Sequence, residues 1–424
     1  MNNFIKSIKG MHDCLPQEVL LWNKIENLFK KILFNYGYSE IRLPILEKTD
    51  LFKRTIGNNT DIIGKEMYSF NDKNGISFTL RPEATTSCVR SVIQNHLLHN
   101  KKQKLWYYGP MFRYERPQKG RYRQFYQFGI ETFGFSELDI ELELIMLINR
   151  FLKKLGILQY LTLEINSIGS ILNRKKYQMV LNDFLKKHQS VLDENSLHKL
   201  EKNSLRILDS KNDNIQKLLL QAPKLMDFVD KKNKNKFQEL CNHMTDLNIS
   251  YNINYRLVRG LDYYNDIVFE WKTKYLGSKN TICAGGRYDN LVNLLGGPKT
   301  PAIGLAMGME RLLLLLNSCL ITSKKKKESD IYIFFSSFLI KNYVYHFTEN
   351  LRNIASKLKI LVEFQPMNFS KILKNLKKYS TKIILFIDEK QLQYGIIKIH
   401  HIKKKTFQEI HIDNIFNKIN EIFY

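Results

Sequence analysis

The sequence is poor in cysteine and has no long apolar run. It contains five scattered cysteines, Cys14, Cys88, Cys241, Cys283 and Cys319. Without a C-x-x-C pair, they argue against a disulfide framework or a structural zinc site and suit a reducing compartment. The longest uninterrupted leucine run, residues 312–316, has the length of a core segment and is far too short to cross a bilayer. The N-terminal segment lacks a continuous apolar stretch, so we expect no secretory signal, a cytoplasmic location and no membrane partner.

Acidic residues are scarce relative to basic ones. The 424-residue chain carries 66 lysines and arginines against 41 aspartates and glutamates, a formal charge of +25. This excess favours a polyanionic partner, because clustered cations release counterions from phosphates. The chain is also rich in lysine, isoleucine and asparagine together, which is typical of compositional drift, so charge alone is weak support for nucleic-acid binding. Hydrophobic residues make up 44% of the chain, enough for two or three globular domains.

Hydrophobic periodicity divides the chain into regions. Residues 17–36 have apolar side chains at helical spacing, with Pro16 near the start. Short strand-like runs follow, the first of them broken at Pro44. Beyond residue 330, apolar strand-like runs alternate with helical stretches, which predicts a small α/β domain. The boundaries that we predict are a core at 1–170 and 251–322, a helical insertion at 171–250, a linker at 323–329 and the α/β domain at 330–424.

The stretch MFRYERPQKGRYRQFYQFGIE, residues 111–131, combines five cations with six aromatic residues around a Pro-Gln-Lys-Gly break. The pattern predicts an antiparallel hairpin. Three interpretations remain open at this point: a general RNA-binding hairpin, a mononucleotide pocket and a solvated surface loop.

The spacing of polar residues in this hairpin favours a pocket. Arg113 and Glu115 alternate before the loop, so we expect both to point to one face of the sheet. Gln127 and Glu131 lie four residues apart on the return strand and share a face as well. On such a floor, Phe125 can stack on a base and Arg113 can hold a phosphate with two hydrogen bonds.

Three segments resemble the motifs of class II aminoacyl-tRNA synthetases. FRYERPQKGRYRQFYQFGIE is similar to motif 2, and IRLPILE (41–47) is similar to motif 1, whose proline lies at the dimer interface in that family. GLAMGMERL (304–312) is similar to motif 3, although Ala306 stands where many members have glycine. We expect GLAMGMERLLLLL to form a glycine-edged turn that feeds a buried helix.

Further segments resemble one family within this class, the histidyl-tRNA synthetases. LVRGLDYYNDIVFEW (257–271) and CAGGRYDNLV (283–292) are similar to its histidine-specific segments, and TLRPEATTSCVR (79–90) is similar to its strand that contacts the α-amino group. The resemblance runs from IKGMHD near the N-terminus to the C-terminal domain. It implies an α+β catalytic core on an antiparallel sheet, with a helical insertion and a C-terminal α/β domain that binds the anticodon.

The resemblance also implies roles for particular residues. Arg113 and Arg259 would be catalytic, with Arg259 where other class II enzymes place a metal ion. The histidine site would comprise Glu83, Thr85, Arg113, Gln127, Glu131, Arg259, Tyr263 and Tyr264, with Glu83 and Thr85 alternating on one strand face. The ATP site would comprise Arg113, Glu115, Arg121, Phe125 and Arg311. The residues that would face the acceptor end of the tRNA are Arg116, Gln118 and Lys119.

The implied reaction is the two-step ligation of L-histidine to tRNA(His) by a homodimer. Histidyl-adenylate forms first with release of pyrophosphate, ATP is the substrate, and Mg²⁺ bridges its β- and γ-phosphates. We expect no metal to be held by the protein alone. The histidines at 12, 96, 99 and 243 lack a cysteine or acid partner at ligand spacing.

The alternative function is a non-catalytic, histidine-sensing regulatory subunit on the same fold, of the type that partners ATP phosphoribosyltransferase. Such paralogues generally lack the C-terminal domain and the arginines that bind ATP. Here the tail is present, and so are Arg113, Arg121, Arg259 and Arg311, which favours the ligase. A plain basic RNA-binding protein does not account for the two acids Glu83 and Glu131.

Overall fold

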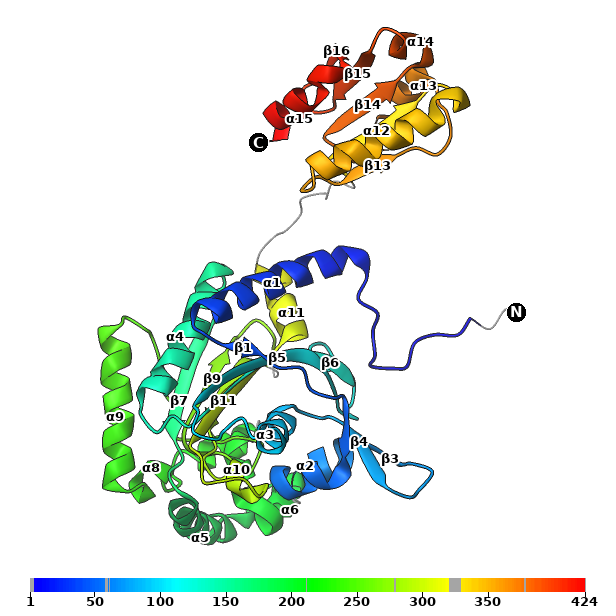
Figure 1. The fold of residues 1–424 in the computed structure, drawn as a ribbon. Helices are drawn as coiled ribbons and strands as arrows, with labels where there is room; N and C mark the ends of the chain where they lie inside the picture. Colours follow the sequence, from blue (N-terminus) through cyan, green and yellow to red (C-terminus); the bar gives the residue numbers. More distant parts are fainter. Residues whose placement is uncertain are drawn as a thin grey trace. The chain divides into compact units, whose positions relative to one another are not determined.

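The computed structural model describes residues 4–57, 60, 62–210, 212–277, 280–319, 329–376 and 379–423. The chain forms two compact units, Met1–Ile321 and Thr322–Tyr424 (Figure 1). Of the linker predicted at 323–329, residues 323–328 lie outside the described ones.

The N-terminal unit is built on an eight-stranded sheet. In spatial order its strands are β1 (Ser39–Glu40), β5 (Gln103–Phe112), β6 (Gln124–Phe133), β11 (Ala302–Gly308), β10 (Thr281–Arg287), β9 (Asn265–Lys272), β7 (Thr162–Ser167) and β8 (Asn252–Ile253). All pairings from β5 to β7 are antiparallel, whereas the short edge strands β1 and β8 pair in parallel. The antiparallel core predicted from the sequence is confirmed.

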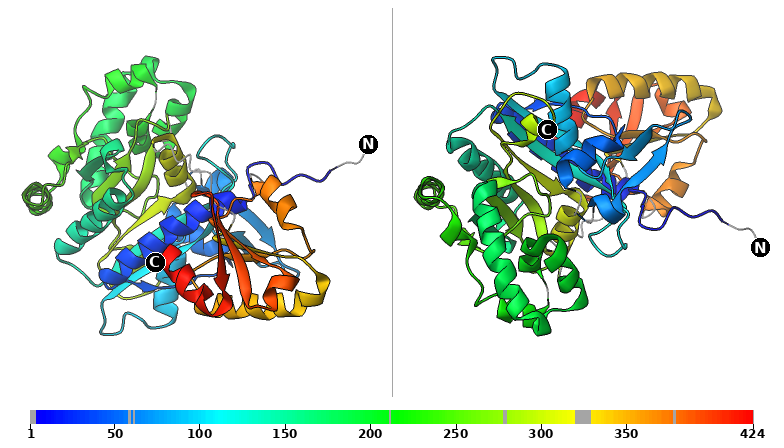
Figure 2. Two further views of the ribbon diagram at one scale, coloured as in Figure 1. Left: turned by 90° about the horizontal axis from the view of Figure 1, so that it is seen from above. Right: turned by 90° about the horizontal axis from the view of Figure 1, so that it is seen from below.

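Helices cover both faces of this sheet. One buried cluster contains residues of α1 (Pro16–Asn35), α4 (Asp139–Lys154), α9 (Lys231–Asp246) and α11 (Met309–Cys319). A second contains residues of α3 (Thr85–Gln94), α5 (Ile171–Lys187) and α10 (Leu291–Leu294). Successive residues of β5 contribute to both clusters, because side chains alternate along a strand. Trp106 packs in the first cluster and Tyr107 in the second. Figure 2 shows α1 along one side of the sheet.

The first helix follows the predicted pattern closely. It was expected at residues 17–36 and spans Pro16–Asn35, with a proline at its first position. Its buried residues are Ile25, Phe29, Ile32 and Leu33, which form a single stripe at helical spacing.

A smaller three-stranded sheet follows the predicted break at Pro44. Its strands are β2 (Leu46–Lys48), β4 (Ser77–Leu80) and β3 (Tyr68–Asn71), all antiparallel. The helix α2 (Thr49–Ile56) continues directly from β2. This small sheet leads the chain to α3, which borders the cavity described below.

Residues between β7 and β8 form a helical excursion. It includes α5, α6 (Glu194–Asn203), the 3-10 helix η4 (Ser204–Asp209), α7 (Asp213–Leu218), α8 (Leu225–Phe228) and α9. The helices α5, α6 and α9 begin at side-chain caps, because Ser170, Asp193 and Asp230 each accept a hydrogen bond from the amide three residues further on. No helix in the described part of the chain is long and apolar enough to span a bilayer.

The C-terminal unit contains a five-stranded sheet covered by helices. In spatial order its strands are β13 (Ile360–Val362), β12 (Ile331–Phe335), β14 (Ile383–Ile387), β15 (Ile396–His401) and β16 (Thr406–His411). The first three are parallel and read as apolar runs, because buried clusters lie on both faces. Residues of α12 (Lys341–Ile354) and α15 (Ile415–Phe423) pack on one face, and α13 (Phe369–Lys374) packs on the other. The predicted α/β domain is confirmed.

The glycine-rich segment before α11 is a strand and not the turn that we expected. Residues Ala302–Gly308 form β11, which pairs with β6 on one side and β10 on the other. The glycines serve close packing inside the sheet, because a Cβ atom at Gly304 would collide with the Glu131 carboxylate on β6.

A buried ion network joins the sheet to the helical excursion. Arg287, 2% exposed at the end of β10, donates from Nε and Nη2 to the two carboxylate oxygens of Glu141 at 2.8 and 2.6 Å. Lys236 on α9 donates to the same carboxylate at 3.0 Å. Glu141 on α4 is fully buried, so its charge depends on these two partners.

Replacing Arg287 with methionine should lower the free energy of unfolding by about 3–5 kcal/mol, because the change leaves a buried acid without its bidentate partner. Lys30→Ala is the control, since it breaks an ion pair with Glu26 in which the lysine is 41% exposed and should cost about 0.5 kcal/mol or less. Urea denaturation measures both losses. Equal losses in the two variants would contradict the importance of the network.

Candidate functional site

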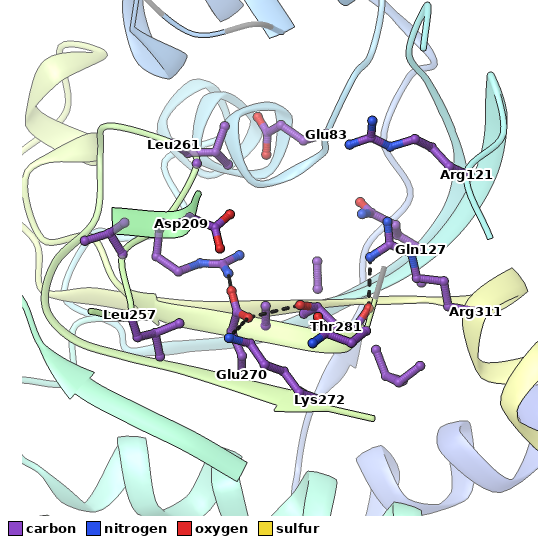
Figure 3. Close-up of a pocket in the computed structure, with 18 of the residues that line it drawn as sticks. Glu83, Arg121, Gln127, Asp209, Leu257, Leu261, Glu270, Lys272, Thr281 and Arg311 are labelled. Atoms are coloured by element: carbon purple, nitrogen blue, oxygen red, sulfur yellow. Dashed lines mark hydrogen bonds and ion pairs between the residues drawn. The ribbon is translucent and has the colours of Figure 1, made fainter. Parts of the chain in front are cut away.

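One cavity of about 640 Å³ lies on the large sheet, lined by segments far apart in the sequence (Figure 3). Its lining includes residues of β6, β9, β10 and β11, the loop between β5 and β6, the start of α3, the irregular segment before β9, and η4. Residues as distant as Glu83 and Arg311 meet there. A concave site with convergent polar side chains is the expected form of a small-molecule pocket.

Three arginines converge on one side of this cavity. Arg311, at the start of α11, donates from Nε to the carbonyl oxygen of Gly120 at 3.0 Å and from Nη1 to that of Thr281 at 2.9 Å. Burial lowers its pKa, and the nearby charges of Arg113 and Arg121 lower it further. Mutual repulsion of this kind is relieved when an anion binds, so the cluster is suited to a polyphosphate. The neighbouring Glu310 carboxylate accepts from the Tyr126 amide at 2.8 Å.

An ion pair within the loop between β5 and β6 stabilises its conformation. Glu115 is 7% exposed and forms an ion pair with Arg121. The backbones of Gln118 and Arg121 exchange two hydrogen bonds, of 3.1 and 2.8 Å, which close the tip. Arg116, Gln118 and Lys119 lie exposed at this tip.

Arg113 connects this loop to the start of α3. Its Nε donates to the carbonyl oxygen of Pro82 at 2.9 Å, and its guanidinium lies 5.2 Å from the centre of the Phe125 ring. Both Arg113 and Phe125 line the cavity. A planar ring beside a guanidinium is suited to a nucleobase that lies next to its phosphates.

Glu83 and Thr85 lie together, but not on the strand that we expected. Thr85 is the first residue of α3, and the Glu83 carboxylate accepts from the amides of Thr85 and Thr86 at 2.7 and 3.1 Å. The acid therefore occupies the N-terminus of a helix, where the helix dipole favours negative charge. Burial raises the pKa of Glu83, and the hydrogen bonds from Thr86 oppose that shift.

Glu131 lies behind the residues that line the cavity and contacts two of them. Its carboxylate is fully buried and accepts from the hydroxyls of Thr85 at 2.7 Å, Tyr107 at 3.0 Å and Tyr288. Burial raises its pKa to about 8. Of the pair predicted to share a face, Gln127 lines the cavity. Glu131 is linked to the cavity through Thr85 and Tyr107, which line it.

The two tyrosines singled out in the sequence both line the cavity. Tyr263 and Tyr264 are 8% and 6% exposed, and their ring centres lie 4.7 Å apart. The Tyr263 ring also contacts the Tyr288 ring edge to face, at 5.7 Å. The guanidinium of Arg259 lies 5.4 Å from the centre of the Tyr264 ring.

Arg259 is anchored by an acid that sequence analysis did not identify. Its Nη1 forms an ion pair with Glu270 on β9, whose carboxylate also accepts from the Thr281 hydroxyl at 3.0 Å. Burial acts to lower the pKa of Arg259, but Glu270 raises it above its ordinary value. Figure 3 shows Glu270 across the cavity from Arg121.

Several cavity residues were missed by sequence reasoning. They are Tyr107, Asp209, Ser210, Gln216, Arg256, Glu270 and Lys272. Glu270 and Lys272 alternate on a strand, and this spacing was a usable signal. Asp209 and Gln216 come from the helical excursion, where the sequence has no pattern that points to a site.

Glu310 is a partly buried acid that lines the cavity beside the arginines. Burial raises its pKa to about 7. Among the residues that the structure describes, no group of three or more His, Cys, Asp or Glu side chains is arranged to hold a metal ion. A metal at this site would therefore have to bring other ligands with it.

The N-terminal segment lies across the loop that carries the arginines. The carbonyl oxygen of Gly10 accepts from the Arg123 amide at 2.7 Å, and the His12 ring packs edge to face on Tyr122 at 4.8 Å. Gly10 has φ of +86°, and a Cβ atom there would lie 2.8 Å from Pro117 Cγ. The position therefore requires glycine on two counts.

Gly10→Ala should destabilise the loop over residues 113–123, because backbone strain and the clash with Pro117 weaken the contact between the N-terminal segment and the loop. We expect amide hydrogen exchange in the loop to accelerate by roughly tenfold, the effect of about 1.4 kcal/mol. Gly37→Ala is the matched control, since Gly37 has φ of +75° but nothing within 4 Å of an added Cβ atom. Unchanged amide hydrogen exchange of the loop in Gly10→Ala would contradict a stabilising role for this contact.

Comparisons of the sequence point to one family. The family model described as histidyl-tRNA synthetase matches residues 10–312. A histidine–tRNA ligase of Buchnera aphidicola subsp. Schizaphis graminum is 53% identical over 424 residues, which cover 100% of this chain and 99% of the relative. The corresponding enzyme of Buchnera aphidicola subsp. Baizongia pistaciae is 49% identical over 397 residues, 94% of this chain and 93% of the relative.

Comparisons of the structure agree. The crystal structure of apo S. aureus histidyl-tRNA synthetase is 31% identical and superposes with a TM-score of 0.80, over 98% of this chain and 99% of that one. A Bacillus halodurans structure described as an ATP phosphoribosyltransferase regulatory subunit/histidyl-tRNA synthetase is 19% identical, with a TM-score of 0.66 over 92% of this chain and 99% of that one. The second likeness concerns the fold alone, so the fold does not separate ligase from regulatory subunit.

Proposed function

The chain belongs to the histidyl-tRNA synthetase family and ligates histidine to its tRNA, and on this premise we propose how its cavity carries out the reaction. One observation carries the proposal: buried acids and hydroxyls adjoin a cluster of arginines in a single cavity. The substrates have matching charges, because histidine brings an ammonium group and ATP brings a polyphosphate.

Histidine would lie between the start of α3 and the two tyrosines. Glu83 and the Thr85 hydroxyl would receive its ammonium group, with the buried Glu131 charge below. Gln127 and Tyr264 would hydrogen-bond the imidazole, with Tyr263 packed alongside. A site that pairs both ring nitrogens rejects other amino acids strongly, because they leave its buried polar groups unpaired.

ATP would lie between Phe125 and the arginine cluster. The adenine would stack on Phe125, Arg311 would hold the γ-phosphate, and Arg121, held by Glu115, would hold the pyrophosphate end. Mg²⁺ would arrive with ATP and would supply positive charge to its phosphates. The donor set suits this arrangement, because Glu115 and Glu310 supply carboxylate oxygens beside the cluster and phosphates and water supply the rest.

Arg113 and Arg259 would act at the reacting atoms. A carboxylate oxygen of histidine attacks the α-phosphorus of ATP, a P–O bond forms, and the bond to pyrophosphate breaks. The two guanidinium groups would orient the carboxylate and stabilise the charge that develops on the α-phosphate. In the second step a hydroxyl of the terminal ribose attacks the adenylate carbonyl, and AMP leaves.

The remaining proposals concern the macromolecular partners. The exposed residues Arg116, Gln118 and Lys119 would face the acceptor end of tRNA(His), and the C-terminal unit would bind the anticodon. The half-exposed Ile45 and Leu46 follow Pro44 and would contribute to a homodimer interface. The described cysteines are all free, which supports a cytoplasmic location.

The regulatory alternative is not favoured. A histidine sensor needs the acids and tyrosines but has no use for three arginines around a polyphosphate site. Arg113, Arg121 and Arg311 all line the same cavity here. The positive charges of Arg113 and Arg121 add to burial in lowering the pKa of Arg311, and this repulsion supports a site for a polyanion such as ATP.

ATP–pyrophosphate exchange, screened across the amino acids, tests the proposal. Histidine alone should support exchange, and Arg259→Ala should lower the rate by about 10²–10³-fold, because one preorganised donor to the developing charge is lost. Arg150→Ala, on the exposed side of α4, should exchange normally. Full activity of Arg259→Ala would remove the role proposed for Arg259, and exchange with several amino acids would contradict the histidine site.

Proton release on histidine binding tests whether Glu131 ionises when the ammonium group of histidine binds. With its pKa near 8, Glu131 is mainly protonated at about pH 7, and a bound ammonium group should ionise it. Binding should therefore release up to about one proton at that pH, and affinity should rise between about pH 6 and 8. Calorimetry in buffers of different ionisation enthalpy measures the release. Glu131→Gln should release none, and equal release by both proteins would contradict this role.

A further inference from the structure

The helical excursion contributes one wall of the active-site cavity. Leu208 and Asp209 of η4, Ser210, and Gln216 of α7 all line it. Figure 3 shows Asp209 and Leu261 together on the side of the cavity away from Arg121. The assignment of the site given above leaves this wall without a role.

The wall faces the irregular segment that carries Arg259. Residues 254–264 contain neither helix nor strand, so no regular backbone pairing fixes their shape. The position of Arg259 therefore depends on contacts that this segment makes with its surroundings.

Hydrogen bonds fasten the segment to the excursion on either side of Arg259. Before it, Arg256 donates from Nη1 to the Gln216 side-chain oxygen at 2.8 Å. After it, the carbonyl oxygen of Gly260 accepts from Arg206 of η4 at 3.3 Å. Gln216 is itself oriented, because its amide nitrogen donates to the carbonyl oxygen of Ser210.

Charge and apolar packing add to these bonds. Burial raises the pKa of Asp262, and the positive charges of Arg206 and Arg174 oppose that shift. Arg174 lies on α5, so a second helix of the excursion faces the same acid. Leu257 shares a buried cluster with Ile207 of η4.

We propose that residues 204–210 and 212–218 of the helical excursion are a positioning element for the first chemical step, with Gln216 as a positioning residue. By holding Arg256 and Gly260, it keeps Arg259 aimed at the α-phosphate. This inference rests on the proposed function of Arg259. Its consequence is that histidine activation depends on the excursion even when no RNA is present.

Pyrophosphate exchange with histidine, measured without tRNA, tests the inference in the full-length protein. Gln216→Ala removes the side-chain acceptor for Arg256 and leaves only the longer bond, of 3.5 Å, to the Gln216 carbonyl oxygen. It should lower kcat by about tenfold, the effect of losing one hydrogen bond to a charged group. The KM values for histidine and ATP should change less than about threefold, because the binding groups remain.

Two further variants show whether the effect is specific. Gln216→Glu keeps an oxygen acceptor for Arg256, so its kcat should stay within about threefold of the parent value. Gln221→Ala removes the same type of side chain from an exposed position beyond α7 and should exchange normally. Arg206→Met breaks the second bond by an independent route and should also lower kcat more than it raises KM.

The outcomes separate cleanly. An unchanged kcat in both Gln216→Ala and Arg206→Met overturns the inference, while the parent enzyme still activates histidine and the proposed function stands. Equal losses in Gln216→Ala and Gln216→Glu also overturn it, because the hydrogen-bond acceptor is then irrelevant. Should Gln216→Ala fail to fold, Arg206→Met and Gln216→Glu decide. A parent enzyme that shows no exchange with histidine contradicts the proposed function itself.

Discussion

The structure depends on one buried carboxylate. Glu131 has no access to solvent and is surrounded by hydroxyls from three separate elements: Thr85 at the start of α3, Tyr107 on β5 and Tyr288 just after β10. An acid removed from water in this way is tolerated only when its oxygens are satisfied. The strand beside it has glycine at 304, where any larger residue would displace the carboxylate. The acid thus sets both the packing of the sheet and the polarity of the cavity above.

The site has two regions, each with charges of both signs. Glu83 and the hydroxyl side chains lie at α3 and the tyrosines together with Arg259, whereas Arg113, Arg121 and Arg311 lie at the loop and α11 together with Glu115 and Glu310. Arg113 bridges the two regions, because it contacts both Pro82 and the Phe125 ring. In the proposed reaction, this arrangement would bring the histidine carboxylate next to the α-phosphate without a covalent catalyst, so positioning and charge would supply the catalysis.

Local patterns predicted the elements that local physics determines. The helix at 16–35 and the hairpin around Arg113 have strong periodic signals, and both formed as expected. Glu83 and Thr85 were brought together as predicted but on a helix end, because the acid caps two free amides there. Gln216 was not predictable, since it reaches the cavity through tertiary packing of a helical region with no distinctive pattern. Sequence motifs locate groups that touch substrates, whereas their supports come from anywhere in the chain.

The contact between Gly10 and Arg123 has a consequence for biosynthesis. Its two halves are separated by more than a hundred residues in the sequence, and the hairpin that receives Gly10 exists only after Arg123 has been translated. During translation, the segment around Gly10 therefore cannot make this contact until the hairpin that carries Arg123 has folded. A bulky extension fused ahead of Gly10 would hinder this late contact. It would disturb the loop over residues 113–123 while leaving the sheet intact.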